Sequence, residues 1–323
     1  TPTFLLSEDV TPLITTHRLQ SFKDALLNSK GYALGYAEDF INSYAELFKD
    51  LSLENKDDSK FLDEWVYESI KSFIPYRDEL IEFLITIAKY SRETEYQEVI
   101  HKLFSKLLHF VCTDLAENPI NDNRKFIIYE MYLYTIATLL KHKRFEILNY
   151  LLRTPYHYFS QSPTFHSRQS LHSYTIFRPY CKSIEEDRKI RLKNKSYSLT
   201  ENIIFENGCT KYFEQIDIVE AEYILYLRSN FDHSLDEYSR GTWYPYTLIK
   251  AMYVHSLPLF VQSSSKELFK NLAAILGVKD RTHLIELIEE KCRNNSFSKI
   301  DYFQSNLCDK LKRLLNLEKL GTL

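Results

Sequence analysis

The residues from Phe126 to Leu140 are almost all apolar, and Glu130 carries the one charge among them. These 15 residues would form a helix of about 22 Å. A helix that crosses a bilayer needs roughly 20 residues, or about 30 Å, so this stretch is too short to do so. A segment this apolar has to be enclosed by other parts of the chain. The stretch therefore predicts a central buried helix and a fold built around it.

Apolar residues recur at helical spacing through most of the chain. One helical face, for example, carries Tyr36, Phe40, Tyr44 and Phe48, each four residues after the last. Only 6 glycines and 9 prolines occur among 323 residues, which argues against turn-dense all-β folds and against phosphate loops built on glycine. The sequence predicts an all-α fold, either a multi-helix bundle or an irregular stack of helical hairpins, with about twelve to fourteen helices.

Breaks in this periodicity divide the chain into three predicted regions. An acidic N-terminal helical region covers 1–123, a basic middle helical region covers 124–242, and a C-terminal helical group covers 243–323. Within the middle region the periodicity fails over 153–172, where two prolines and several serines predict an irregular loop.

Charge is distributed unevenly along the chain. Residues 1–123 contain 12 basic and 22 acidic side chains, whereas residues 124–195 contain 14 and 5, although the formal charge of the whole chain is only -3. A basic block of this kind can bind phosphates or an acidic protein surface. Aromatic residues interleaved with these cations would suit the stacking of unpaired bases.

We interpret the basic middle as a binding surface for another macromolecule, either a protein or a nucleic acid. In the alternative interpretation the acidic first third packs against the basic middle and neutralises it, and the binding interpretation then loses its main support. The predicted contacts are Arg188, Lys189, Arg191, Lys193 and Lys195, followed by Lys141, Lys143 and Arg144.

A second interpretation starts from Arg228 and His233, which are separated by four residues and follow the apolar helical stretch Tyr223–Leu227. This spacing resembles the motif of HEPN ribonucleases, a helical family whose arginine and histidine cleave RNA without a metal ion. The polar residue that usually follows the arginine in this family, often asparagine, is Ser229 here, and Leu235 replaces the aromatic residue often found two positions after the histidine. The resemblance implies that His233 is the general acid or base and that Arg228 stabilises charge on the phosphate.

The sequence contains no motif of the other common enzyme or metal-binding classes. The motifs Gly-x-Ser-x-Gly and His-Glu-x-x-His and the glycine-rich lysine loop are absent. The five cysteines include no close pair, so neither a disulfide framework nor a Cys-x-x-Cys site is indicated. Residues 1–13 lack the basic and apolar segments of a secretory signal. We therefore predict no metal, no cofactor and a cytoplasmic location.

The function predicted from the sequence is that of a non-enzymatic helical interaction or scaffold protein without membrane association. A HEPN-like ribonuclease is the alternative. Richness in Lys, Asn, Ile, Tyr and Phe suggests an AT-rich, microbial genome. Because the chain begins at Thr1, either an initiator methionine was removed or the chain is a piece of a longer protein. The sequence leaves open the identity of the partner and whether the chain forms a homo-oligomer.

Overall fold

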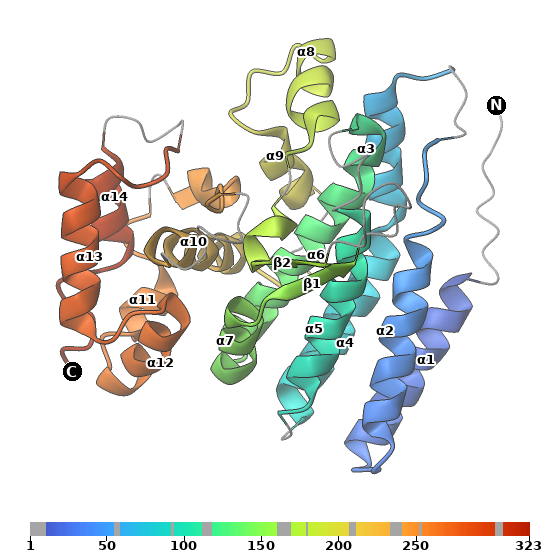
Figure 1. The fold of residues 1–323 in the computed structure, drawn as a ribbon, viewed down its shortest axis with the longest axis horizontal. Helices are drawn as coiled ribbons and strands as arrows, with labels where there is room; N and C mark the ends of the chain where they lie inside the picture. Colours follow the sequence, from blue (N-terminus) through green and yellow to red (C-terminus); the bar gives the residue numbers. More distant parts are fainter. Residues whose placement is uncertain are drawn as a thin grey trace.

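The computed structural model describes residues 11–54, 59–91, 94–111, 118–159, 169–178, 180–206, 211–232, 241–251, 254–300 and 306–323. Within these residues the chain forms 14 α-helices and one two-stranded antiparallel sheet (Figure 1). The all-α class and the number of helices predicted from the sequence are confirmed.

The N-terminal part of the fold is a stack of helices lying side by side. In Figure 1 it extends from α1 and α2 at the right to α7 near the centre. Helix α1 packs against α2 and α4, α2 packs against α5, and α4 packs against α6. The bounds are α1 (Thr11–Leu27), α2 (Ala33–Leu47), α3 (Leu62–Ser72), α4 (Ile74–Tyr90), α5 (Tyr96–Leu107), α6 (Asp122–Lys141) and α7 (Phe145–Arg153).

The C-terminal part packs on the other side of α6. Helix α10 contacts both α6 and α12, and α12 also contacts α7, while α13 and α14 form the left edge in Figure 1. The bounds are β1 (Tyr156–Phe159), β2 (Gln169–His172), α8 (Lys189–Arg191), α9 (Leu199–Glu206), α10 (Gln215–Phe231), α11 (Pro258–Gln262), α12 (Lys266–Leu276), α13 (Arg281–Arg293) and α14 (Leu307–Leu314).

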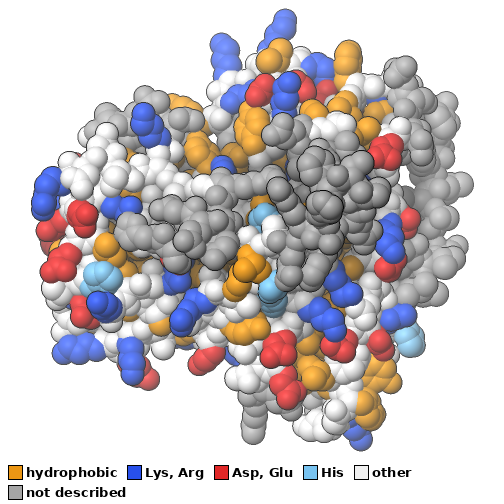
Figure 2. Space-filling view, in the orientation of Figure 1, with side chains coloured by type: hydrophobic (Ala, Val, Ile, Leu, Met, Phe, Trp, Pro, Cys, Tyr) orange, Lys and Arg blue, Asp and Glu red, His pale blue; other side chains and the backbone are white. Residues whose placement is uncertain are grey.

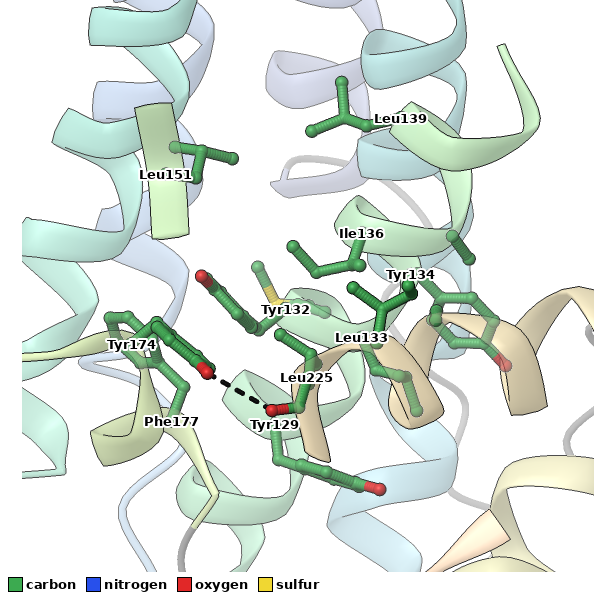
Figure 3. Close-up of a cluster of buried hydrophobic side chains, with 14 of the residues drawn as sticks. Tyr129, Tyr132, Leu133, Tyr134, Ile136, Leu139, Leu151, Tyr174, Phe177 and Leu225 are labelled. Carbon is green, nitrogen blue, oxygen red and sulfur yellow. Dashed lines mark hydrogen bonds between the residues drawn. The ribbon is translucent and has the colours of Figure 1, made fainter. Parts of the chain in front are cut away.

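Helix α6 is the centre of the fold. All of its side chains are buried except those of Arg124 and Lys141. Aromatic and aliphatic side chains of neighbouring elements surround it, and beside it the Tyr174 hydroxyl donates to the carbonyl of Leu225 in α10 at 3.2 Å (Figure 3). The buried helix predicted from the apolar stretch is therefore confirmed.

One hydrophobic cluster joins all three predicted regions. It includes Phe40 from the first region, Tyr132 from the second and Leu272 from the third. The first predicted boundary, at residue 123, lies in the first turn of α6. The division into three regions describes the charge along the sequence and stays a prediction.

The stretch predicted as an irregular loop contains an antiparallel strand pair at its two ends. Strands β1 and β2 pair with Tyr156 opposite His172. Tyr156 is fully buried, and its hydroxyl donates to the carbonyl of Leu151 at 3.0 Å. The Tyr156 ring also stacks on that of His101 in α5, with 4.3 Å between the ring centroids. Tertiary contacts of this second kind, and not an alternation of polar and apolar residues, stabilise the strand, which explains why the sequence pattern did not predict it.

Two cysteines are joined, although the sequence did not indicate a bond between them. Cys292 near the end of α13 and Cys308 at the start of α14 form a disulfide with their Cα atoms 5.7 Å apart. They are 16 positions apart in the sequence, and only the packing of the two helices brings them together. Cys181 is buried and carries a free thiol. The cytoplasmic location stays a prediction.

Candidate functional site

Two of the predicted contacts form ion pairs with the acidic N-terminal region. Arg191 binds Asp63 of α3 through Nε, 3.0 Å from Oδ1, and through Nη2, 2.7 Å from Oδ2. The same side chain reaches Glu64 at 3.0 Å, and Nη1 of Arg188 lies 3.5 Å from Asp63. For Arg188 and Arg191 the alternative interpretation holds, because acidic residues of the N-terminal region balance their charges.

The three lysines of the same block make no ion pair with any described residue. Lys189 donates from Nζ to the carbonyl of Tyr197 at 2.9 Å, and Lys193 and Lys195 are exposed after α8. Lys193 has a left-handed backbone with φ 49°, and its amide donates to the carbonyl of Ile190 at 3.1 Å. This closes the helix in the manner of a C-terminal cap, so the backbone that carries these lysines is fixed.

The second set of predicted contacts, at the corner between α6 and α7, has mainly internal partners. Lys141 binds Asp217 with 2.6 Å between Nζ and Oδ2. Arg144 donates from Nη1 to the carbonyls of Ala88 at 3.2 Å and Ser91 at 2.9 Å, at the end of α4. A cation at this position stabilises the unpaired carbonyls of a helix C-terminus. Lys143 alone of the three is exposed without an ion pair to a described residue.

A buried carboxylate beside this corner leads to a prediction about pH. Glu220 lines a cavity of about 150 Å³ with Lys141 and Lys143, and burial raises its pKa to about 7 although the Leu259 amide donates to it at 2.6 Å. Because the pKa of Glu220 in the folded state lies above its unfolded value of 4.5, the protonated carboxyl stabilises the native state. This stabilisation is fully present below pH 4.5 and is lost as the pH rises through about 7.

Between pH 5 and pH 8.5 the wild type should therefore lose about 2 to 3 kcal/mol of unfolding free energy relative to Glu220→Gln, which keeps the acceptor without the charge. Urea unfolding at a series of pH values measures this difference. The exposed Glu267→Gln serves as the control and should show none. A constant difference between wild type and Glu220→Gln would contradict the prediction.

Exposed apolar side chains accompany the lysines at the top of the molecule as Figure 1 draws it. Ile190 is 75% exposed and Leu192 is 47% exposed, and more than half of Tyr180 and Tyr197 is accessible. Figure 2 shows hydrophobic, basic and acidic side chains side by side at this end, and the exposed acidic residues of this segment are Glu186 and Asp187. We call this region the apical surface, which consists of Tyr180, Lys189, Ile190, Leu192, Lys193, Lys195 and Tyr197.

Sequence reasoning found the cations of the apical surface and missed its apolar members. A signal was available, because Ile190 and Leu192 are two residues apart in a stretch that is otherwise charged. Residues two apart do not share a helical face, so a helix here cannot bury both.

Buried hydrogen bonds fix the base of the apical surface. The amide and hydroxyl of Ser183 each donate to Oδ2 of Asp122 at 2.8 Å. Oε1 of Glu185 accepts from the amide of Thr200 at 2.8 Å, where α9 begins. The segment Ser183–Arg188 between these anchors is a π-helix, a rare conformation that occurs frequently at functional sites. The apical surface is therefore presented on a well-anchored support.

A cleft of about 350 Å³ opens beside the apical surface. It lies between the π-helical projection and the connector that follows α10, and it shares Tyr180, Lys189 and Tyr197 with the apical surface. We call it the tyrosine cleft, and its walls include Arg178, Tyr180, Lys189, Tyr197, Tyr244 and Tyr246.

The arginine of the ribonuclease interpretation is buried beside the C-terminus of α12. Arg228 is 6% exposed, and its Nη1 donates to the carbonyl of Ile275 at 3.1 Å while its Nη2 binds Asp232 at 3.1 Å. These contacts give Arg228 a capping role on α12. His233 lies outside the described residues, so the pairing of the two side chains stays a prediction.

No family model, no curated protein and no solved structure matches the chain. In the described part of the chain no group of three or more His, Cys, Asp or Glu side chains is placed to hold a metal ion. Over the same residues, no helix combines the length and apolarity that crossing a membrane requires.

Proposed function

We propose that the chain is a non-enzymatic interaction or scaffold protein that binds an acidic protein through its apical surface. The observation that supports this most is the position of Ile190, three-quarters exposed on an anchored projection, beside lysines that have no acidic partner among the described residues. An apolar centre with a polar, charged rim is the usual composition of a protein interface.

The apolar part of the apical surface favours binding. Single exposed apolar residues are ordinary, but several on one short projection indicate an interaction site. Full burial of Ile190 or of Leu192 against a partner would contribute about 1.5 to 3 kcal/mol. Their support is already ordered, because Ser183 and Glu185 bind buried or helix-capping groups, so little conformational entropy is lost on binding.

The charges of the apical surface favour an acidic protein over a nucleic acid. Arginine binds phosphate better than lysine does, and both arginines of this block are committed to Asp63. Tyr180 and Tyr197 carry rings that can stack on bases, but Ile190, the most exposed apolar member, offers neither a ring nor a hydrogen-bond donor to a base. The lysines instead complement carboxylates around an apolar contact on a partner protein.

Site-specific photo-cross-linking tests this proposal. A benzophenone amino acid at position 190 should give a discrete cross-linked protein product in the cell, whereas the same group at Val261, which is also an exposed aliphatic position, should not. Combining it with Lys193→Glu and Lys195→Glu should lower the yield about tenfold, because the reversed charges repel an acidic partner.

Three results would contradict the proposal. Equal yields from positions 190 and 261 would show that the apical surface is not special, and a product containing only this chain would indicate a homo-oligomer. Salt-sensitive binding of single-stranded RNA that is lost in the same lysine variant would replace the protein partner by a nucleic acid. If that RNA were also cleaved, and cleavage were lost in His233→Ala, the ribonuclease interpretation would be favoured.

A further inference from the structure

The tyrosine cleft contains two cations that lack counterions among the described residues. The Arg178 side chain forms no hydrogen bond or ion pair with any of them, and its Nε atom is buried without an acceptor. Lys189 contributes one hydrogen bond, to the carbonyl of Tyr197. The guanidinium of Arg178 lines the cleft, so an anion there can pair with its terminal nitrogens.

The acidic side chain that lines the cleft is already committed elsewhere. Glu185 accepts at Oε1 from the hydroxyl of Ser198 at 2.7 Å and from the Thr200 amide at 2.8 Å, and at Oε2 from the Leu199 amide at 3.3 Å. Its two oxygens therefore cap α9, although the carboxylate keeps its negative charge. The lining thus contains two cations and one carboxylate, and the Tyr180 hydroxyl donates to a second carboxylate, Glu186, at 2.8 Å.

Aromatic rings form the other walls of the cleft. The Tyr180 and Tyr197 side chains are more than half exposed, and the rings of Tyr244 and Tyr246 lie 5.0 Å apart. Rings around paired cations provide apolar contact for the stem or ring of a residue whose end is charged. The volume of about 350 Å³ lies within the range of ligand pockets and accommodates such a residue.

We infer that the tyrosine cleft binds an anionic side chain of the partner polypeptide, with the carboxylate or phosphate on Arg178 and Lys189 and the stem against the tyrosines. This inference rests on the proposed function and specifies its partner. Lys189 lines the cleft and precedes Ile190 in the chain, so one acidic segment of the partner can fill the cleft and cover the apical surface.

Fluorescence anisotropy with a labelled random copolymer of glutamate and tyrosine tests the inference without knowledge of the partner. The wild type should bind this polymer and not the corresponding lysine–tyrosine polymer. Arg178→Gln combined with Lys189→Gln should weaken binding about tenfold or more. The matched pair Arg293→Gln with Lys270→Gln, two exposed cations of the C-terminal helices, should change it less than about twofold.

A second variant guards against misfolding, since Arg178 is half-buried. Tyr197 is 66% exposed, so Tyr197→Ser removes a ring from the cleft without disturbing the core, and it should weaken binding about threefold to tenfold. Displacement by phosphotyrosine at lower concentration than by N-acetylglutamate would identify phosphate as the preferred anion, and the reverse order would identify carboxylate.

The inference and the proposed function fail in different ways. Polymer binding that is indifferent to Arg178 and Lys189, or equal binding of labelled oligouridylate with the same dependence on these residues, overturns the inference. If the cross-link at position 190 is still formed in that case, the proposed function stands. If the cleft binds the polymer but no cross-link forms at position 190, the tyrosine cleft still binds anionic side chains. The proposed function of the apical surface is then contradicted.

Discussion

Replacing Glu130 by alanine is expected to lower the free energy of unfolding by about 3 to 5 kcal/mol. Glu130 of α6 and Arg77 of α4 form a buried ion pair with 3.0 Å between Oε1 and Nη1, and their side chains are 4% and 2% exposed. Arg77 also binds Asp78 at 2.9 Å, but that carboxylate is 26% exposed and satisfies other nitrogens of the guanidinium. Without Glu130, the buried Nη1 atom would lose its carboxylate, and Asp78 at the edge of the core would remain as a counterion.

Urea unfolding of the single and double variants measures this effect. Replacing both partners, as in Arg77→Met with Glu130→Leu, should restore most of the loss, because the charge and its counterion leave together. Glu38→Ala is the matched control, since Glu38 pairs with Lys102 at the surface, and it should cost less than about 1 kcal/mol. A loss below about 1 kcal/mol for Glu130→Ala would contradict the interpretation of the pair as buried.

Burial of Glu130 could be predicted from the sequence, and its partner could not. The apolar stretch around Glu130 placed it in a central helix, which the structure confirms. Arg77 lies 53 residues earlier in a helix with other charged residues, and no local pattern distinguishes it from them. Periodicity reports which face of a helix is buried, whereas a contact between two helices depends on how they pack.

For the apical surface, too, the sequence predicts the residues present but not their contacts. Five cations between Arg188 and Lys195 were predicted to act as one group, since the sequence counts them equally. The fold separates them, because Asp63 of α3 approaches Arg188 and Arg191 and leaves the lysines without acidic partners among the described residues. Charge along a sequence therefore predicted a basic block, and the three-dimensional structure decides which of its members remain available for a partner.

Tertiary contacts also explain the features that sequence reasoning missed. The tyrosine cleft combines Tyr180 and Tyr197 with Tyr244 from a distant connector, and no spacing rule relates them. The disulfide between Cys292 and Cys308 requires the packing of α13 against α14. Each arises from elements that are separate in the sequence and meet in the folded structure.

Replacing Gly277 by alanine is expected to cost about 3 kcal/mol of unfolding free energy. Gly277 ends α12 with a left-handed backbone, φ +73°, and a Cβ atom there would lie 2.2 Å from Nη1 and 2.7 Å from Cζ of Arg228. The buried guanidinium would have to move away from the carbonyl of Ile275 and from Asp232, so the variant combines backbone strain with the loss of charged hydrogen bonds.

Gly241 separates these two contributions. It also has a positive φ of +100°, but an added Cβ would meet no atom of the described residues within 4 Å, so Gly241→Ala should cost only about 1 kcal/mol. In an Arg228→Met background the cost of Gly277→Ala should fall to nearly the same value, because the obstructing guanidinium is gone. If the full cost persists in that background, Arg228 is not the source of the strain, and its assignment as the cap of α12 would be wrong.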